Sequence, residues 1–264
     1  MQNFDITAVI NGHKEGLMAL SSLRSLTRNA EVARARGIAV QLIAILDKPD
    51  QLTREIFESF ALMHQDIELK IVLLGDLGYA RNEAAVLASG KWICFLDADD
   101  IWSDSWIADA YAAAESEDGK REVVWHPEIN VYFGTSPHIY LHRDMDDPRF
   151  DLSTLAYINP WTALAFVSTS FLRRTPYCGT DLVRGIGYED WSWNIEVLNQ
   201  GAVHKVVPGS THAIRTKPVS LVSQTTAAGC IPRPTDFLRR MIGRRHHAFL
   251  QRAARDAVEE TSYA

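Results

Sequence analysis

Short apolar runs alternate with longer amphipathic segments along the first hundred residues of the chain. Four mainly apolar runs are predicted to form buried strands, at 6–10, 40–46, 69–74 and 93–96. The segments between them carry apolar residues at helical spacing or have high helix propensity, which predicts helices over 15–36, 52–63 and 80–88. Strands of this kind, alternating with helices, are typical of a mainly parallel sheet covered by helices on both faces. The first part of the chain is therefore predicted to be an α/β fold.

This rhythm changes after Asp100. Helices are predicted over 105–117 and 190–199, and short strands over 123–126, 130–133, 138–141, 163–170 and 203–207. A charged loop is predicted at 143–151, and Pro208-Gly209 is expected to end the last strand. The second part is predicted to be mixed α+β.

The end of the chain, predicted to be a helical tail over 218–264, has its own charge pattern. Residues 233–255 hold seven arginines against the single Asp236. An apolar stripe accompanies them, formed by Leu238, Met241, Ile242, Phe249 and Ala253. A basic amphipathic helix suits an anionic membrane surface, and packing on the rest of the chain or dimerisation are the alternatives.

Composition narrows the class of protein. With 264 residues, of which 47% are hydrophobic and 23% charged, the chain resembles a soluble protein of one large or two small domains. Its net charge of −6 argues against nucleic acid as a partner, because binding that polyanion depends largely on Lys and Arg. The three cysteines are odd in number and scattered, so they are expected to be reduced thiols in the cytoplasm. No signal peptide is recognised, and the uncharged run 152–172 is expected to be core because Asn159-Pro160 interrupts it.

Three carboxylates, those of Asp97, Asp99 and Asp100, directly follow the fourth apolar run. In an extended chain Asp97 and Asp99 would share one face, at the carboxyl end of a strand, where open α/β sheets bind ligands. Two such carboxylates repel each other unless a cation lies between them, and a divalent metal carrying a phosphate fits best. An EF-hand calcium loop is not expected, because the further acid and the glycine that it requires are missing here. A phosphatase with an aspartyl nucleophile is not favoured either, because its acids would follow the first strand and not the fourth.

Three motifs occur in an order that resembles glycosyltransferase family 2, a group of inverting enzymes with the GT-A fold. They are an acid after the second strand, the segment 77–85 with its Ala-Arg-Asn element, and 88–100 with its Asp-Ala-Asp element. Residues 185–191, Gly-Ile-Gly-Tyr-Glu-Asp-Trp, resemble the acceptor-side acidic motif, with an apolar strand expected to end at Arg173-Arg174 before it.

The resemblance covers about residues 5 to 217. It implies a GT-A domain over 1–217, with a Rossmann-like nucleotide-sugar-binding half at 1–104 and an acceptor-side half at 105–217.

The resemblance implies roles for residues on the nucleotide-sugar side. Asp47 and Arg81 would contact the nucleotide base, although a loop cap and a solvated helix charge are the alternatives. Asp97 would accept from the ribose or uracil side and help bind metal. Asp99 would bind Mg²⁺ or Mn²⁺ on the diphosphate, where the metal neutralises charge on the leaving group.

The resemblance also implies a general base, Asp190, with Glu189 orienting either the acceptor or Asp190. The alternative is that both are ordinary acids at a helix N-terminus. His212, expected after the last strand, would complete the metal shell, and Arg215 would hold diphosphate oxygens. For both of these a surface position is the alternative.

These implications predict a metal-dependent inverting glycosyltransferase that uses a nucleoside diphosphate sugar, with UDP-sugars favoured, and a glycan or lipid-linked acceptor. Its place would be the cytoplasm, with the tail at the inner membrane face as one option. The turn after Asn11 departs from the family, and no Gln-x-x-Arg-Trp element occurs, so a processive synthase is not expected. A nucleotidyltransferase and a non-catalytic sugar-nucleotide-binding module are the other function classes, and Asn11-Gly12-His13 makes a poor phosphate loop for the first.

Overall fold

The computed structural model describes residues 4–162, 165–218, 220–237, 239–240 and 243. Within these residues the strands form one nine-stranded sheet. Its strands are β1 (Phe4–Gly12), β2 (Val40–Asp47), β3 (Ile67–Val72), β4 (Gly90–Asp97), β5 (Ile101–Trp102), β6 (Val123–Gly134), β7 (His138–Leu141), β8 (Phe166–Ser168) and β9 (Val203–Thr216).

The sheet has a parallel half and a mixed half. Its strand order is β3-β2-β1-β4-β8-β6-β9-β5, with β7 added to β6. The pairs among β3, β2, β1 and β4 are parallel, whereas β8 is antiparallel to both β4 and β6. Since β6 and β9 are again parallel, the sheet agrees with the mainly parallel first part and mixed second part predicted from the sequence.

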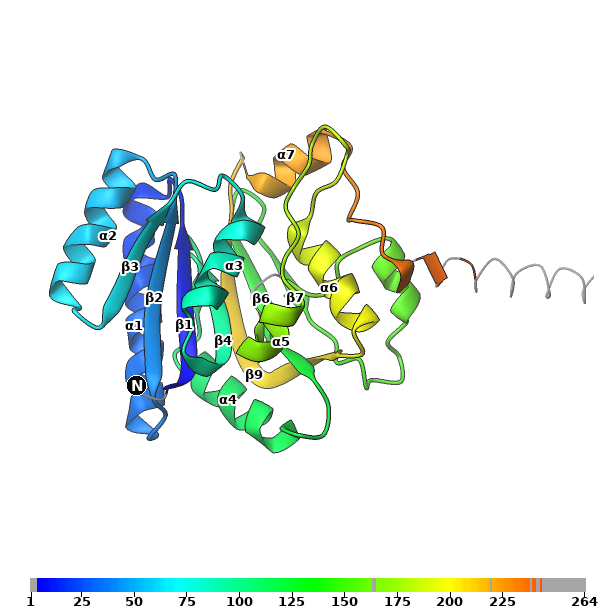
Figure 1. The fold of residues 1–264 in the computed structure, drawn as a ribbon, viewed down its shortest axis with the longest axis horizontal. Helices are drawn as coiled ribbons and strands as arrows, with labels where there is room; N and C mark the ends of the chain where they lie inside the picture. Colours follow the sequence, from blue (N-terminus) through cyan, green and yellow to red (C-terminus); the bar gives the residue numbers. More distant parts are fainter. Residues whose placement is uncertain (1–3, 163–164, 219, 238, 241–242, 244–264) are drawn as a thin grey trace, which may run out of the picture.

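Helices cover both faces of this sheet (Figure 1). On one face α1 (Ala19–Ala35), α2 (Gln51–Met63) and α4 (Trp106–Glu117) share a buried cluster with the strands. On the other face α3 (Leu77–Leu87), α5 (Thr169–Arg174) and α6 (Glu189–Asn199) share a second cluster. Two short 3₁₀ turns, Gly16–Met18 and Leu152–Ala156, and α7 (Leu221–Ala227) complete the described elements.

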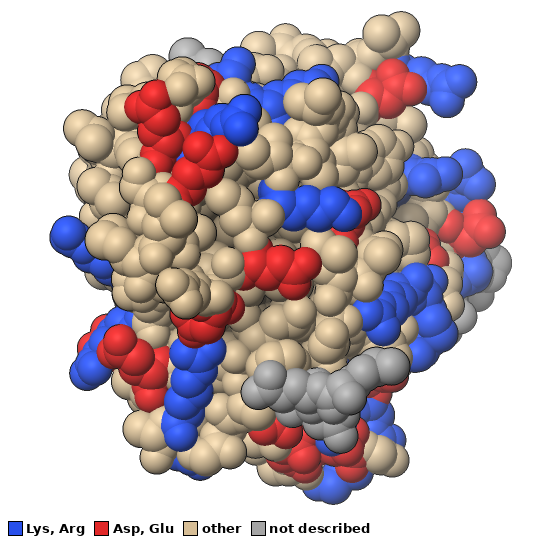
Figure 2. Space-filling view, turned by 60° about the vertical axis from the view of Figure 1, so that its left-hand side comes forward, with Lys and Arg blue, Asp and Glu red and all other residues tan. Residues whose placement is uncertain are grey.

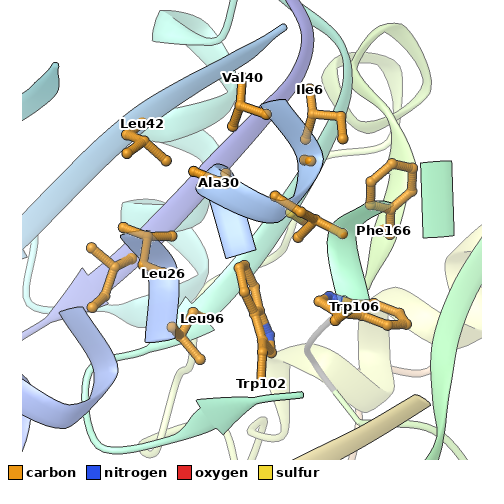
Figure 3. Close-up of a cluster of buried hydrophobic side chains, with 14 of the residues drawn as sticks. Ile6, Leu26, Ala30, Val40, Leu42, Leu96, Trp102, Trp106 and Phe166 are labelled. Carbon is orange, nitrogen blue, oxygen red and sulfur yellow. The ribbon is translucent and has the colours of Figure 1, made fainter. Parts of the chain in front are cut away.

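Alternation along the strands decides which residues face which helices. In β1, Ala8 and Ile10 belong to the cluster under α1, and Val9 belongs to the cluster under α3. Figure 3 shows the first cluster, in which Leu26 of α1 and Trp106 of α4 meet strand residues. By the same alternation, the last residues of β2 and β4, Asp47 and Asp97, are on the face covered by α3.

Two long strands replace several short ones predicted from the sequence. β6 runs unbroken from Val123 to Gly134, and β9 continues through Pro208 and Gly209 to Thr216, so the predicted end at Val207 is wrong. The register between them shifts at Pro127/Ile129, which leaves 208–210 opposite a single residue of β6. A bulge of this kind accommodates proline and glycine inside a strand.

The described segment 165–174 also differs from its prediction. β8 is only three residues long, and Arg173 and Arg174 lie in α5, not at the end of a strand. The Ser168 side chain accepts a hydrogen bond from the backbone of Phe171, which caps the helix at its start. Arg173 donates to the carbonyls of Ala85 and Ala88 at the end of α3, and so ties the two helices together.

The described part of the C-terminal region packs on the loop before α6. A capping box between Ser220 and Ser223 starts α7, and Ile231 then pairs with Ile186. The five residues of the predicted apolar stripe are Leu238, Met241, Ile242, Phe249 and Ala253, all of which lie outside the described residues. None of the helices in the described ranges is long and apolar enough to cross a bilayer.

Charged side chains of opposite sign are interspersed on the face of the molecule drawn in Figure 2. The ion pairs Arg34–Asp66 and Arg36–Asp109 join surface helices to their neighbours, with 2.7 and 2.6 Å between nitrogen and oxygen. Such exposed pairs contribute little stability each.

Candidate active site

Acidic residues end the two parallel strands that flank β1. Asp47 ends β2 and Asp97 ends β4. The Asp47 carboxylate is 7% exposed and accepts hydrogen bonds from the backbone N–H groups of Leu74, Gly75 and Asp76 at 2.8–3.0 Å. Asp47 therefore holds the loop that leads into α3. Its contact with a nucleotide base stays a prediction.

Arg81 of α3 lies fully buried between two acids. Its Nη2 donates to both Asp97 oxygens at 3.1 and 3.3 Å, and its Nη1 donates to Glu189 Oε1 at 3.1 Å. With 0% exposure, Arg81 is not the solvated helix charge considered as an alternative. Its observed partners are carboxylates from β4 and α6, so it joins the two predicted halves of the site. The predicted contact with a nucleotide base remains a prediction.

The charges of this buried group depend on one another. Burial alone would lower the pKa of Arg81, but Asp97, Tyr177 and Glu189 raise it above its ordinary value. Burial and the neighbouring Asp190 raise the pKa of Glu189, and Arg81 opposes them. Glu189 is only 6% exposed. The Arg81 guanidinium, which donates to both Asp97 and Glu189, is thus the main compensation for the free-energy cost of burying the Glu189 charge.

Asp190 lies beside Glu189 in the first turn of α6, where helix N–H groups favour a carboxylate. Its Oδ1 accepts a hydrogen bond from the backbone of Trp191 at 2.8 Å, and its Oδ2 accepts from Asn159 Nδ2 at 3.0 Å. Burial raises the pKa of Asp190, whereas Arg81 and these hydrogen bonds lower it. Glu189 and Asp190 are helix N-terminal acids, as the alternative supposed, but both also have tertiary partners.

The expected alternation of Asp97 and Asp99 is wrong, because β4 ends at Asp97. The chain then turns, and the backbone N–H of Asp100 donates to the Asp97 carbonyl at 3.0 Å. Asp97 pairs with Arg81, whereas Asp99 Oδ2 lies 2.7 Å from Lys217 Nζ. Asp100 is 3% exposed and accepts from the backbone of Arg215 at 2.8 Å. The acids of this motif therefore have different partners.

His212 and Arg215 lie within β9, not after the last strand as predicted. His212 is 1% exposed, and its Nε2 lies 3.7 Å from Asp100 Oδ2. Burial lowers the pKa of His212 to about 3, so the imidazole is neutral. The Arg215 guanidinium lies over the Phe133 ring, 4.7 Å from its centroid. Its contact with a diphosphate stays a prediction.

A metal held by protein side chains alone does not fit the site. In the described ranges no group of three or more His, Cys, Asp or Glu residues lies close enough to hold one. The metal role of His212 stays a prediction. A cation does fit at Asp99, because this carboxylate already binds the Lys217 ammonium. Mg²⁺ and related ions on a diphosphate need only one or two carboxylates, since phosphates and water supply the other oxygens. Asp99 and Asp97, with side chains 11% and 29% exposed, fit that kind of complex.

The sequence did not single out Asn159, which the structure places against Asp190. Its only local signal is its position before Pro160, and an Asn-Pro pair is also common in ordinary turns. It is a further residue of the candidate site.

Comparison with known proteins adds a family to this geometry. A model described as Glycosyl transferase family 2 matches residues 10–177, from β1 to the segment after α5. The match ends before α6, which carries Glu189 and Asp190.

Three solved structures have similar folds. S. aureus TarS 1-349 in complex with UDP-GlcNAc has a TM-score of 0.61 and 15% identity, over 83% of this chain and 61% of that one. GalNAc-T7 with UDP, GalNAc and Mn²⁺ has a TM-score of 0.58 and 16% identity, over 82% of this chain and 44% of that one. The mannosyltransferase PcManGT from Pyrobaculum calidifontis, in complex with GDP-Man and Mn²⁺, has a TM-score of 0.58 and 14% identity, over 85% of this chain and 60% of that one. This chain thus spans less than two thirds of the length of each, and these identities show a shared fold alone.

Proposed function

This chain belongs to glycosyl transferase family 2, and from that premise we propose that it transfers a sugar from a nucleoside diphosphate sugar to a hydroxyl group of a glycan or lipid-linked acceptor, with inversion. The observation that supports this most is the buried bridge through Arg81. It holds Asp97, at the ligand-binding end of β4, in one charged group with Glu189, the neighbour of Asp190. A donor-side acid and an acceptor-side base must lie close together for a direct displacement.

Asp190 is proposed as the general base. Inversion requires a base on the face of the sugar opposite the leaving group, to take the proton of the acceptor hydroxyl as its oxygen attacks. Asp190 suits this role because the residue is half-buried and both carboxylate oxygens are oriented by hydrogen bonds. Glu189 is directed at Arg81, so it acts as a positioning residue for the first turn of α6.

A divalent cation, Mn²⁺ or Mg²⁺, is proposed at Asp99 and Asp97 together with the donor diphosphate. Such an ion supplies positive charge that stabilises the departing nucleoside diphosphate. Two of the similar structures contain Mn²⁺, which supports this choice of cofactor class. Arg215 lies next to Asp100, where its charge can bind phosphate oxygens.

A UDP-sugar is the favoured donor, because similar structures contain UDP-GlcNAc or UDP, although another contains GDP-Man. We expect UDP-GlcNAc or UDP-GalNAc with Mn²⁺ to raise the melting temperature more than GDP-mannose does. Ligand at about 100 times its Kd adds about 2.7 kcal/mol. For a chain of this size that corresponds to about 5–10 °C. Differential scanning fluorimetry measures the shift.

The same screen tests the function when the released product is analysed. Release of nucleoside diphosphate supports transfer, release of pyrophosphate indicates a nucleotidyltransferase, and binding without product indicates a non-catalytic module. Asp99→Asn should lose the part of the shift that depends on Mn²⁺. Asp104→Asn, an exposed acid that only approaches Arg28 at 3.4 Å, should keep it. No stabilisation by any of the three sugars, with or without Mn²⁺, would contradict the proposal.

Lys217 is expected to compete with the metal for Asp99. Its ammonium lies 2.7 Å from the carboxylate, so a cation on Asp99 must displace it. Because the lysine is half-exposed, its loss should strengthen Mn²⁺ binding only modestly, by about two- to fivefold in Kd. Electron paramagnetic resonance of free Mn²⁺, in the presence of UDP, measures this for Lys217→Met. Lys91→Met, which breaks pairs with Glu115 and Asp118 far along β4, is the control. Weaker Mn²⁺ binding in Lys217→Met would contradict the competition.

A further inference from the structure

Asn159 connects two positions on α6 that lie one helical turn apart. Its Nδ2 donates to Asp190 Oδ2 at 3.0 Å, and its Oδ1 accepts from Asn194 Nδ2 at 2.9 Å. Residues four apart lie on the same face of a helix, so a single side chain can bridge them. The bridging side chain comes from a loop more than thirty residues earlier in the chain, after the 3₁₀ turn Leu152–Ala156.

The direction of these hydrogen bonds is fixed at both ends. Asn194 Nδ2 also donates to the Trp161 carbonyl at 3.1 Å, and a carbonyl can only accept. Asn194 therefore donates an N–H to Asn159, which accepts through its Oδ1. The nitrogen of Asn159 then faces Asp190, whose ionised carboxylate also only accepts. Both ends of the chain of bonds give the same amide orientation.

The loop that carries Asn159 is firmly held. The next residue but one, Trp161, is 1% exposed, stacks on His204 with ring centroids 3.9 Å apart, and donates through its indole N–H to the Arg143 carbonyl at 3.0 Å. The Pro160 carbonyl accepts from the Tyr140 hydroxyl at 3.2 Å. A side chain on such a segment holds its partner in one geometry before substrate binds, so no conformational entropy is lost there on binding.

We propose that Asn159 is a positioning residue for Asp190, which it orients and keeps ionised for proton removal from the acceptor. The inference rests on the proposed function, because it takes Asp190 as the general base. One oxygen of Asp190 is fixed by the amide and the other by the backbone of Trp191, so the carboxylate cannot rotate freely. Its remaining lone pairs then have one direction relative to α6.

The amide also shifts the balance of charge around Asp190. Burial and the neighbouring Glu189 favour the neutral form of Asp190, whereas Arg81 favours its ionised form. Tyr177 and Tyr132 nearby are neutral phenols, because burial and the acids around them raise their pKa. Asn159 adds a donor on the side of the ionised form. A general base works only when deprotonated, so removing this donor should move the acidic limb of the pH–rate profile to higher pH.

Three variants test this. Asn159→Ala removes the donor, and the limb should rise by about one pH unit. Asn159→Asp keeps the shape and the bond from Asn194 but places a second carboxylate against Asp190, so its limb should rise further. Asn199→Ala removes another amide of α6, bonded to Glu196 and Arg240, and should leave the profile unchanged.

The rate is measured as release of nucleoside diphosphate from whichever of UDP-GlcNAc, UDP-GalNAc and GDP-mannose the screen selects, with water as the acceptor. The turnover number should fall about tenfold in Asn159→Ala, whereas the KM for the donor should stay within about twofold. An unshifted acidic limb in both Asn159 variants overturns the inference, even if transfer itself is established.

A second measurement does not depend on activity. Carboxyl ¹³C NMR gives the titration midpoint of Asp190, identified by its loss in Asp190→Asn, and this midpoint should rise in Asn159→Ala. If wild type releases no nucleoside diphosphate, the proposed function fails while the titration still tests the contact. An equal midpoint in wild type and Asn159→Ala overturns the inference.

Discussion

Replacing Asp190 with asparagine is expected to lower the turnover number by about a thousandfold and to leave the affinity for nucleoside diphosphate unchanged. General base catalysis contributes about 10²- to 10⁴-fold, and asparagine keeps the shape of the side chain but cannot take a proton. Within the described residues, the Asp190 carboxylate hydrogen-bonds to Asn159 and to the backbone of Trp191, not to Asp97 or Asp99. The loss should therefore fall on turnover.

Steady-state kinetics with isothermal titration of UDP and Mn²⁺ separate the two quantities for Asp190→Asn. The control is Asp181→Asn, which changes an acid in the preceding loop that only caps Arg184. Turnover near wild type in Asp190→Asn would assign the base to another residue. Lost UDP binding would instead mean that Asp190 belongs to the donor side.

The first half of the fold was predictable because its signals are local. The strands β1, β2 and β4 contain mainly apolar runs, and each helix between the first four strands shows its own periodicity or propensity. β3 was predicted as a buried strand at 69–74, but it lies at Ile67–Val72 with only Ile67 buried. The later elements depend on tertiary contacts. β9 passes through Pro208 and Gly209 only because a bulge against β6 absorbs them, and α5 has six residues, too few to show a helical repeat.

The candidate site was predicted in outline and not in its contacts. A run that ends in acid places carboxylates at the ligand-binding edge of a parallel sheet, and Asp47 and Asp97 are found there. The hydrogen-bond partners of the site residues were not predictable, because they come from segments that are distant in the sequence. Arg81 and Glu189 are 108 positions apart, and no local pattern distinguishes a buried helix arginine from an exposed one. Lys217 and Asn159 likewise reach the site from loops.

The position of Arg81 has an energetic consequence. The site buries acids from two parts of the chain, and one guanidinium compensates both. Removing one partner of a buried ionic group typically costs about 3–5 kcal/mol, because the charges left behind have lost their solvation and their counter-charge. Arg81 should therefore matter as much for folding as for catalysis.

Arg81→Met is expected to lower the melting temperature by about 6–20 °C, since each kcal/mol corresponds to about 2–4 °C for a chain of this size. The deficit should shrink as pH falls from about 8 to about 5. Burial already raises the pKa of Glu189, and without Arg81 this pKa rises further. An acid whose pKa is raised by folding destabilises the folded state at pH values above its unfolded pKa. This destabilisation decreases as the pH falls and the acid becomes protonated. Thermal denaturation at several pH values measures both effects. Arg34→Met, which breaks an exposed pair with Asp66, should cost less than about 1 kcal/mol at every pH. A similar small, pH-independent change in Arg81→Met would show that the buried bridge does not hold the two halves of the site together.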